Sequence, residues 1–125
     1  MGKRLHVAKT YKVEYSSFQR FNYKTEEFRN LLGILDCPTY GMDEYDEGYG
    51  DNFEVEKKFY DKAIETLKAY DKQDEELRED IDQCIEALYG NGQAKEELRM
   101  EAISDLETYR KEAEPEGEYM FFSFF

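Results

Sequence analysis

The chain has little of the material from which disulfide scaffolds and zinc sites are built. Its 125 residues include no tryptophan, two prolines, one histidine (His6) and two cysteines (Cys37 and Cys84). Two cysteines do not form a disulfide framework, and a zinc site normally takes three or four protein ligands. Neither kind of structure is therefore expected here.

Long hydrophobic runs are absent as well. No stretch approaches the roughly 18 apolar residues that a membrane helix needs, and the basic N-terminal residues are not followed by the apolar segment of a signal peptide. The sequence also contains no P-loop, dinucleotide-binding fingerprint, nucleophile elbow or Cys-x-x-Cys motif. We expect a cytoplasmic protein without a membrane partner.

Acidic side chains are abundant, and they are unevenly placed. The chain carries 30 Asp and Glu against 17 Lys and Arg, a net charge of −13. Residues 1–30 hold seven bases and three acids, whereas residues 31–56 hold eight acids and no base. Such a field repels nucleic acid and anionic membranes and attracts basic partners. The alternative interpretation is an acidic surface that serves only solubility.

Two strands are predicted, one at each end of the chain. Residues 4–15 alternate between apolar odd positions and polar even positions, which predicts a half-buried strand with a basic outer face. The final run, from Gly117 to Phe125, is almost entirely aromatic and follows Pro115, which also favours a strand. Because a lone strand leaves its backbone groups unpaired, we expect these two strands to pair with each other.

Four helices are predicted between these strands, over about 22–35, 53–70, 74–89 and 93–113. Asn22 or Thr25 can cap the first helix, and Asp74 can cap the third, over about 74–89. Cys84 falls on the apolar face of this third helix. Short connections favour antiparallel neighbours. The expected fold is a single domain over 1–125 of the α+β class, mostly helical, with about four helices packed on a small antiparallel sheet formed by the N- and C-terminal strands.

The acidic loop before the second helix resembles a calcium loop in its spacing. A glycine stands at position 6, and the candidate metal ligands at positions 1, 5, 9 and 12 are Asp43, Glu47, Asp51 and Glu54. Tyr45, at position 3, lacks a carboxylate or amide oxygen, and there is no second loop. A solvated acidic loop that caps the next helix is the alternative interpretation. Apart from this loop, no cofactor is expected.

Aromatic residues define the predicted interaction surface. Tyr45 and Tyr49 are interleaved with acids in the loop, while Met120, Phe122 and Phe124 share one face of the terminal strand. Only one face of that strand can cover the helices of its own domain, and an apolar face of this size is not expected to stay wet. We expect it to be covered either by the acidic loop or by a second copy of the protein, as a homodimer.

A basic patch is predicted near the N-terminus, and it could hold single-stranded nucleic acid by stacking and charge. The net charge argues against that role, and a basic strip facing the protein's own acidic helices is the simpler interpretation. The patch comprises Arg4, Lys12, Arg20, Lys24 and Arg29, with Tyr11, Tyr15, Phe18 and Tyr23 nearby.

No catalytic constellation emerges. A Cys–His pair of Cys37 and His6 is possible by composition, but the spacing gives it no support, and His6 is expected on the outer face of the first strand. The paired carboxylates of the helices are explained by their position at helix starts and on polar faces. We therefore expect a protein without enzymatic activity.

The opening residues Leu5-His6-Val7-Ala8-Lys9-Thr10-Tyr11, followed by Val13-Glu14-Tyr15 and Phe21-Asn22-Tyr23, resemble the start of short uncharacterised proteins encoded on mobile elements of gut bacteria. The similarity covers about the first quarter of the chain and carries no chemical motif. It implies a context, as an accessory protein of a conjugative element or phage, and no activity.

These observations favour a non-enzymatic, acidic interaction module that binds another, basic protein. The alternative is an acidic mimic of nucleic acid that inhibits a DNA-binding enzyme such as a restriction nuclease. A third hypothesis is calcium binding or a small enzyme activity at the Asp43–Glu54 loop.

Overall fold

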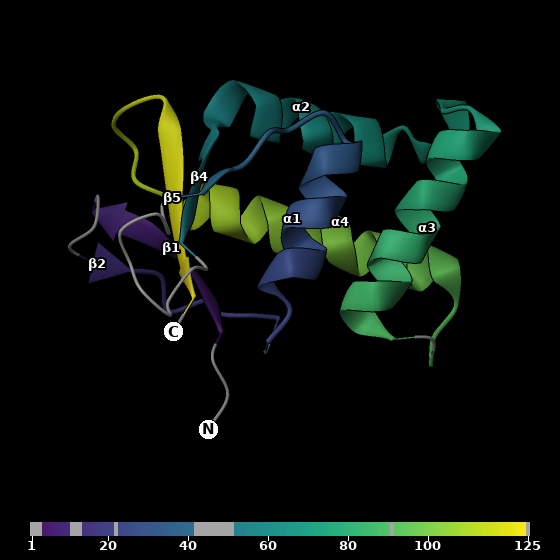
Figure 1. Cartoon of the computed structure of the whole chain (residues 1–125), viewed down its shortest axis with the longest axis horizontal. Coiled ribbons are helices and arrows are strands. Elements are labelled where there is room, and N and C mark those ends of the chain that lie inside the picture. The colour runs from purple at the N-terminus through teal and green to yellow at the C-terminus, as the bar shows by residue number, and fades with distance from the viewer. Residues whose placement is uncertain (1–3, 11–13, 22, 42–51, 91, 125) are drawn as a thin grey trace.

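The computed structural model describes residues 4–10, 14–21, 23–41, 52–90 and 92–124. They form one five-stranded antiparallel sheet with four α-helices and a short 3-10 helix (Figure 1), which confirms the α+β, mostly helical fold. In chain order the elements are β1 (Leu5–Thr10), β2 (Glu14–Tyr15), α1 (Thr25–Ile34), β3 (Tyr40–Gly41), β4 (Phe53–Glu56), α2 (Lys57–Lys68), η1 (Tyr70–Lys72), α3 (Glu75–Tyr89), α4 (Lys95–Glu112) and β5 (Tyr119–Phe124).

The two ends of the chain pair as predicted. Strand β5 is antiparallel to β1, with Leu5 opposite Phe124 and Val7 opposite Phe122. The strand order is β2-β1-β5-β4-β3, so β5 lies in the middle of the sheet with a neighbour on each side. The edge strands of the sheet are therefore β2 and β3.

The second predicted helix begins later than expected, because Phe53–Glu56 is strand β4. Phe53 and Val55 are buried and alternate with half-buried Glu54 and Glu56, a period of two that suits a strand beside β5. Helix α2 starts at Lys57, whose buried ammonium group donates hydrogen bonds to the carbonyl oxygens of residues 114, 116 and 117 at 2.6, 3.3 and 2.9 Å. Lys57 thereby fixes the turn that leads into β5.

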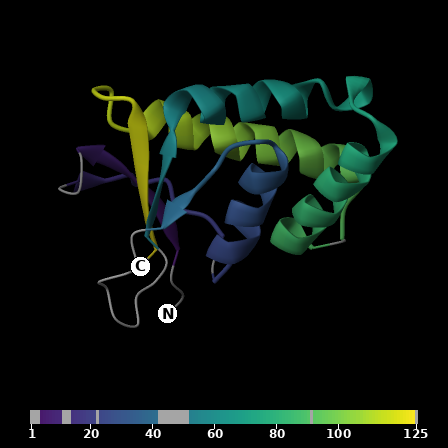
Figure 2. The same ribbon diagram turned by 45° about the horizontal axis from the view of Figure 1, so that its top comes forward.

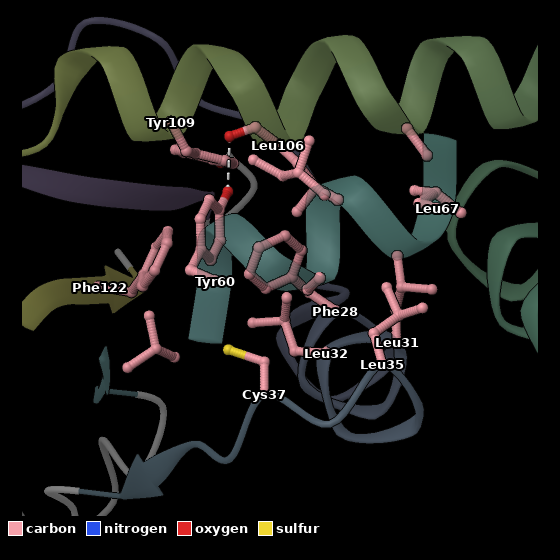
Figure 3. Close-up of a cluster of buried hydrophobic side chains, with 14 of the residues drawn as sticks. Phe28, Leu31, Leu32, Leu35, Cys37, Tyr60, Leu67, Leu106, Tyr109 and Phe122 are labelled. Atoms are coloured by element: carbon pink, nitrogen blue, oxygen red, sulfur yellow. Dashed lines mark hydrogen bonds between the residues drawn. The ribbon is translucent and has the colours of Figure 1, made fainter. Parts of the chain in front are cut away.

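The hydrophobic core lies between the inner face of the sheet and the helices (Figure 3). Phe122 stacks on Phe53 with ring centroids 4.9 Å apart and meets the edge of Tyr109 at 5.3 Å. The hydroxyl of Tyr60 is buried and donates to the Leu106 carbonyl at 2.7 Å, which joins α2 to α4. A buried tyrosine needs such a partner, and here the backbone of the neighbouring helix supplies it.

The outer face of β1 differs from the prediction, because two of its even positions, His6 and Ala8, are buried. His6 is only 8% exposed, and Ala8 is buried too. The chain folds back after β1, so that the Ser16 carbonyl lies 3.2 Å from His6 Nδ1 and the Ser16 hydroxyl accepts from the Val7 N–H. The predicted basic outer face is therefore wrong at His6.

The helices extend away from the sheet, with α2 and α4 side by side and α3 at the far end (Figures 1 and 2). Helix α3 packs against α1 and α4. Its start is as predicted, since Asp74 accepts a hydrogen bond from the Leu77 N–H at 2.8 Å. It ends at Gly90, whose φ of 86° is a conformation that residues other than glycine rarely adopt.

Candidate functional site

A row of carboxylates runs along α3, which we call the acidic row: Glu75, Glu79, Asp82 and Glu86. The intervals of four, three and four residues keep them on one side of the helix. At about 1.5 Å of rise per residue, successive members are roughly 4.5 to 6 Å apart along the axis. Glu75, Glu79 and Glu86 are exposed and Asp82 is half-buried.

Three members of the row carry a charge that the fold does not neutralise. Among the described residues, Glu75, Glu79 and Glu86 form no ion pair with any base. Asp82 differs, because Arg99 Nη1 lies 3.1 Å away and the Tyr70 hydroxyl donates to it at 2.7 Å. The row thus has one member fixed by the fold and three that face solvent.

A shallow hollow of about 350 Å³ lies beside the row. Carboxylates supply half of its lining residues, and Lys95 is the one base among them; the lining comprises Glu79, Asp82, Gln83, Glu86, Ala87 and Lys95. A hollow of this composition suits a cationic side chain. The acidic row and its hollow are the candidate site.

The surface between α2 and α4 has the opposite arrangement. Arg110 Nε lies 2.7 Å from Asp61 Oδ1, and Lys68 Nζ lies 2.8 Å from Glu107 Oε2. These pairs line a groove of about 530 Å³ between the two helices. Asp61 and Glu107 each face a base of the neighbouring helix, and Glu65 lies 3.9 Å from Lys68 of its own helix, so little charge is left for a partner.

A partly buried polar cluster around Arg20 joins the N-terminal segment to α4. Arg20 Nη2 lies 2.6 Å from Glu101 and 3.2 Å from Asp105. The Tyr89 hydroxyl donates to Asp105 at 2.6 Å. Burial raises the pKa of Asp105, against the lowering effects of the Tyr89 hydrogen bond and the Arg20 charge. These groups form hydrogen bonds and ion pairs with one another, so we assign the cluster a structural role in joining the two segments.

Most of the predicted calcium loop lies outside the described residues. This applies to Asp43, Glu47 and Asp51, and also to Tyr45 and Tyr49 of the predicted interaction surface. Glu54 is described, and it is half-buried on β4. Within the described ranges no group of three or more His, Cys, Asp or Glu residues could hold a metal ion. Calcium binding stays a prediction, to be tested by titration calorimetry with calcium at millimolar concentration.

The face of the terminal strand that was predicted to bind a partner points into the core of the protein instead. Met120 and Phe122 are 1% and 0% exposed and belong to the core of the chain itself, so a partner cannot reach them in this fold. They point inward because they pair in register with buried Val55 and Phe53 of β4. Phe124 lies opposite Leu5 in the register of β1 and β5.

The structure argues against nucleophilic chemistry at Cys37 and His6. Cys37 is buried in the core (Figure 3), and its burial, with the nearby Glu56 charge, raises the pKa of its thiol to about 12. A thiol with such a pKa holds its proton at neutral pH and is a poor nucleophile. His6 is buried on the sheet beside Ser16.

The predicted basic patch is only partly assembled. Arg4, Arg20 and Lys24 line a common hollow. Arg29 lies elsewhere, with its guanidinium 5.2 Å from the Phe53 ring centroid and its Nε donating to Thr39. Phe18 is partly buried against Tyr109. Lys12 and Tyr11 lie outside the described residues.

The acidic row was missed by the sequence-based prediction of site residues, although its signal is visible in the sequence. Its acids were explained as favourable charges at helix starts and on polar faces. The repeated spacing of four, three and four residues is the additional signal, because it selects one line along the helix from a generally acidic segment.

None of the described helices combines the length and the apolar character needed to cross a bilayer. No protein-family model, curated protein or solved structure matches the chain.

Proposed function

We propose that the protein is a non-enzymatic interaction module of the cytoplasm that binds a basic protein through the acidic row of α3. The observation that carries this proposal is the lack of ion-pair partners for Glu75, Glu79 and Glu86 among the described residues, in a fold that pairs charges between α2 and α4. An accessory role in a conjugative element or phage, which the resemblance of the N-terminal quarter implies, is part of this proposal.

The electrostatics of α3 support the same proposal. The helix contains six acids and one base, a net charge of −5. Like charges four residues apart on a helix are destabilising by about 0.2–0.5 kcal/mol per pair. Among the described residues Glu75, Glu79 and Glu86 gain no ion pair that offsets this cost, and we attribute their presence to a use outside the fold. A basic partner would relieve this repulsion and be steered by the net charge of the chain.

The experiment is an NMR titration of the ¹⁵N-labelled protein with an octalysine peptide at low salt. We expect chemical-shift changes concentrated at residues 75–87 and 95, which line the row and its hollow, and small changes in α2. Changes spread evenly over every acidic segment would contradict the proposal, because they would indicate attraction by net charge alone.

Mimicry of a nucleic-acid backbone is a second candidate, and the regular spacing of the row favours it. Carboxylates at roughly 4.5 to 6 Å along a line present a chain of negative charges. A mimic should displace duplex DNA from a restriction endonuclease in a gel-shift competition without metal. If the protein does not displace DNA at equimolar concentration but does bind octalysine at α3, the mimicry proposal is rejected and the protein-binding proposal is retained.

Self-association is proposed in a different place from the predicted one. The core position of Met120 and Phe122 moves any contact with a second copy to the outer face of the sheet. There Tyr119 is 42% exposed, with its ring centroid 6.4 Å from that of Tyr40 on edge strand β3. Light scattering of the wild type and of a Tyr40→Ser, Tyr119→Ser variant tests this contact. A wild-type monomer at high concentration would contradict it.

A further inference from the structure

A hollow of about 470 Å³ lies where the N-terminal segment meets the C-terminal end of α3, and its charge is opposite to that of the chain as a whole. We call it the basic hollow; its lining consists of Arg4, Gln19, Arg20, Phe21, Lys24, Leu88 and Tyr89. Three of these side chains are cationic and none is a carboxylate. The two hollows described above each contain several acids.

The backbone that carries Arg20 is held in place by the fold. The Arg20 backbone is fixed on both sides, since its N–H donates to the Tyr109 hydroxyl at 3.1 Å and its carbonyl accepts from the Leu5 N–H at 2.9 Å. This bridge between residues 5 and 20 brings exposed Arg4 next to Arg20. Arg4 forms no ion pair among the described residues, so its charge is available.

The ammonium group of Lys24 is positioned by one hydrogen bond and keeps further N–H donors for a ligand. Its ammonium group donates to the Ala87 carbonyl at 2.9 Å, at the C-terminal end of α3. An ammonium group has three N–H donors, so two remain for a ligand. The contact offsets the partial negative charge of the helix end, which would otherwise repel an anion. Arg20 contributes less charge, because Glu101 and Asp105 already neutralise it.

The backbone beside the hollow is strained. Phe21 and Tyr23 have φ values of 62° and 59°, in the left-handed region that residues other than glycine rarely adopt. Only one other residue of this kind, Asp36, occurs in the described part of the chain. Phe21 is held there by ring contacts with Phe28 and Tyr89. Strain of this kind concentrates at binding and catalytic sites, where the surrounding fold enforces it.

We propose that the basic hollow binds a phosphate group, either free inorganic phosphate or the phosphate of a small phosphomonoester. A phosphate carries close to two negative charges at neutral pH and several strong acceptor oxygens. Arg4 and Lys24 supply the charge, and Gln19 supplies an additional amide donor. The site is distinct from the acidic row, since it takes ligands of the opposite sign.

The test is a titration of the full chain with inorganic phosphate and, separately, with O-phosphoserine, followed by ¹⁵N chemical shifts of residues 19–24 and 88–89. The variant Arg4→Gln, Lys24→Gln removes two charges from the hollow. The matched control Lys62→Gln, Lys72→Gln removes two charges from exposed sites outside it. We expect the first variant to bind at least roughly tenfold more weakly, as for loss of charge-assisted hydrogen bonds, and the control to stay within about twofold of the wild type.

Tighter binding of O-phosphoserine would identify a phosphomonoester as the ligand, and tighter binding of inorganic phosphate would identify the free ion. Equal loss of affinity in the two variants would overturn the proposal, because the effect would then come from net charge. The proposal would also be overturned if sodium chloride at matched ionic strength gave the same shifts as phosphate.

Discussion

Helices α2 and α3 differ both in net charge and in how many of their acids form ion pairs. Helix α2 contains four lysines and two acids, a net charge of +2, whereas α3 contains one arginine and six acids, a net charge of −5. Asp61 and Lys68 of α2 pair with Arg110 and Glu107 of α4 across a groove. The exposed acids of the row on α3 form no ion pair among the described residues.

The ion-paired charges between α2 and α4 stabilise the fold, whereas the unpaired acids of the row do not. Ion pairs between α2 and α4 place charges of opposite sign at 2.7 and 2.8 Å, so removing one partner leaves the other unsatisfied. Removing an acid from the row instead relieves repulsion. Stability and binding should therefore respond to substitutions in different places.

The largest effect on stability is expected at Asp105, the most buried acid of the clusters described here. Asp105→Ala leaves the Arg20 guanidinium and the Tyr89 hydroxyl without their shared acceptor. We expect a loss of about 2–3 kcal/mol in the free energy of unfolding, measured by urea denaturation. Glu97→Gln, an exposed change on the same helix, is the control and should change little.

The pH dependence of stability tests the buried environment of Asp105. Its pKa is raised in the folded state, chiefly by burial, so the folded protein holds this proton more tightly than the unfolded chain does. The contribution of this group to stability is therefore greatest at low pH and falls as pH rises through the raised pKa. As pH rises through the raised pKa, the free energy of unfolding of the wild type should fall relative to that of the Asp105→Asn variant. A difference that grows with pH would contradict this sign.

The next effect is expected at Arg99, which holds the one fixed member of the row. Its guanidinium carbon lies 3.7 Å from the Tyr70 ring centroid, and it pairs with Asp82 where both side chains are mostly buried. Arg99→Ala should cost about 1–2 kcal/mol, from the lost cation–π contact and the unpaired carboxylate. Arg99→Lys should recover only part of this loss, because an ammonium group stacks and bridges less well.

The pair between Asp61 and Arg110 should matter less. It lies at the surface, with side chains 51% and 35% exposed. Asp61→Ala is expected to cost under about 1 kcal/mol, and this cost should shrink in 0.5 M salt because the pair is screened. A loss as large as that of Asp105→Ala would show that the groove charges are more deeply coupled to the core.

The smallest effect on stability is expected in the row itself. Glu75→Gln, Glu79→Gln, Glu86→Gln should leave the free energy of unfolding unchanged or raise it by a few tenths of a kcal/mol, since three like charges are removed. Thermal unfolding in low salt measures this. A clear loss of stability would mean that the row has partners inside the protein and would undermine its proposed role in binding.

Local patterns predicted the fold well where one element alone determined the outcome. The aromatic run of β5, the cap at Asp74 and the stop at Gly90 are all features of a few neighbouring residues. The single alternating strand predicted over residues 4–15 is instead two strands, β1 and β2, which pair antiparallel. The pairing of the two termini also followed, because a lone strand must find a partner.

The predictions failed where a distant neighbour decided the structure. Phe53–Glu56 fits either a helix start or a short strand, and only the presence of β5 beside it selects the strand. Met120 and Phe122 were assigned to a surface because the alternation of β5 gives two apolar faces without stating which one meets the helices. His6 is buried because the chain returns over it at Ser16, ten residues later.

The most direct test of the central claim compares two variants of equal charge. Glu75→Gln, Glu79→Gln, Glu86→Gln and Asp61→Asn, Glu65→Gln, Glu107→Gln each remove three negative charges, so both change the net charge from −13 to −10. Binding of a fluorescein-labelled octalysine peptide is followed by anisotropy. We expect the α3 variant to bind at least roughly tenfold more weakly than the α2–α4 variant, because the row supplies the contacts. Equal weakening in both would contradict the claim, because only net charge would then matter.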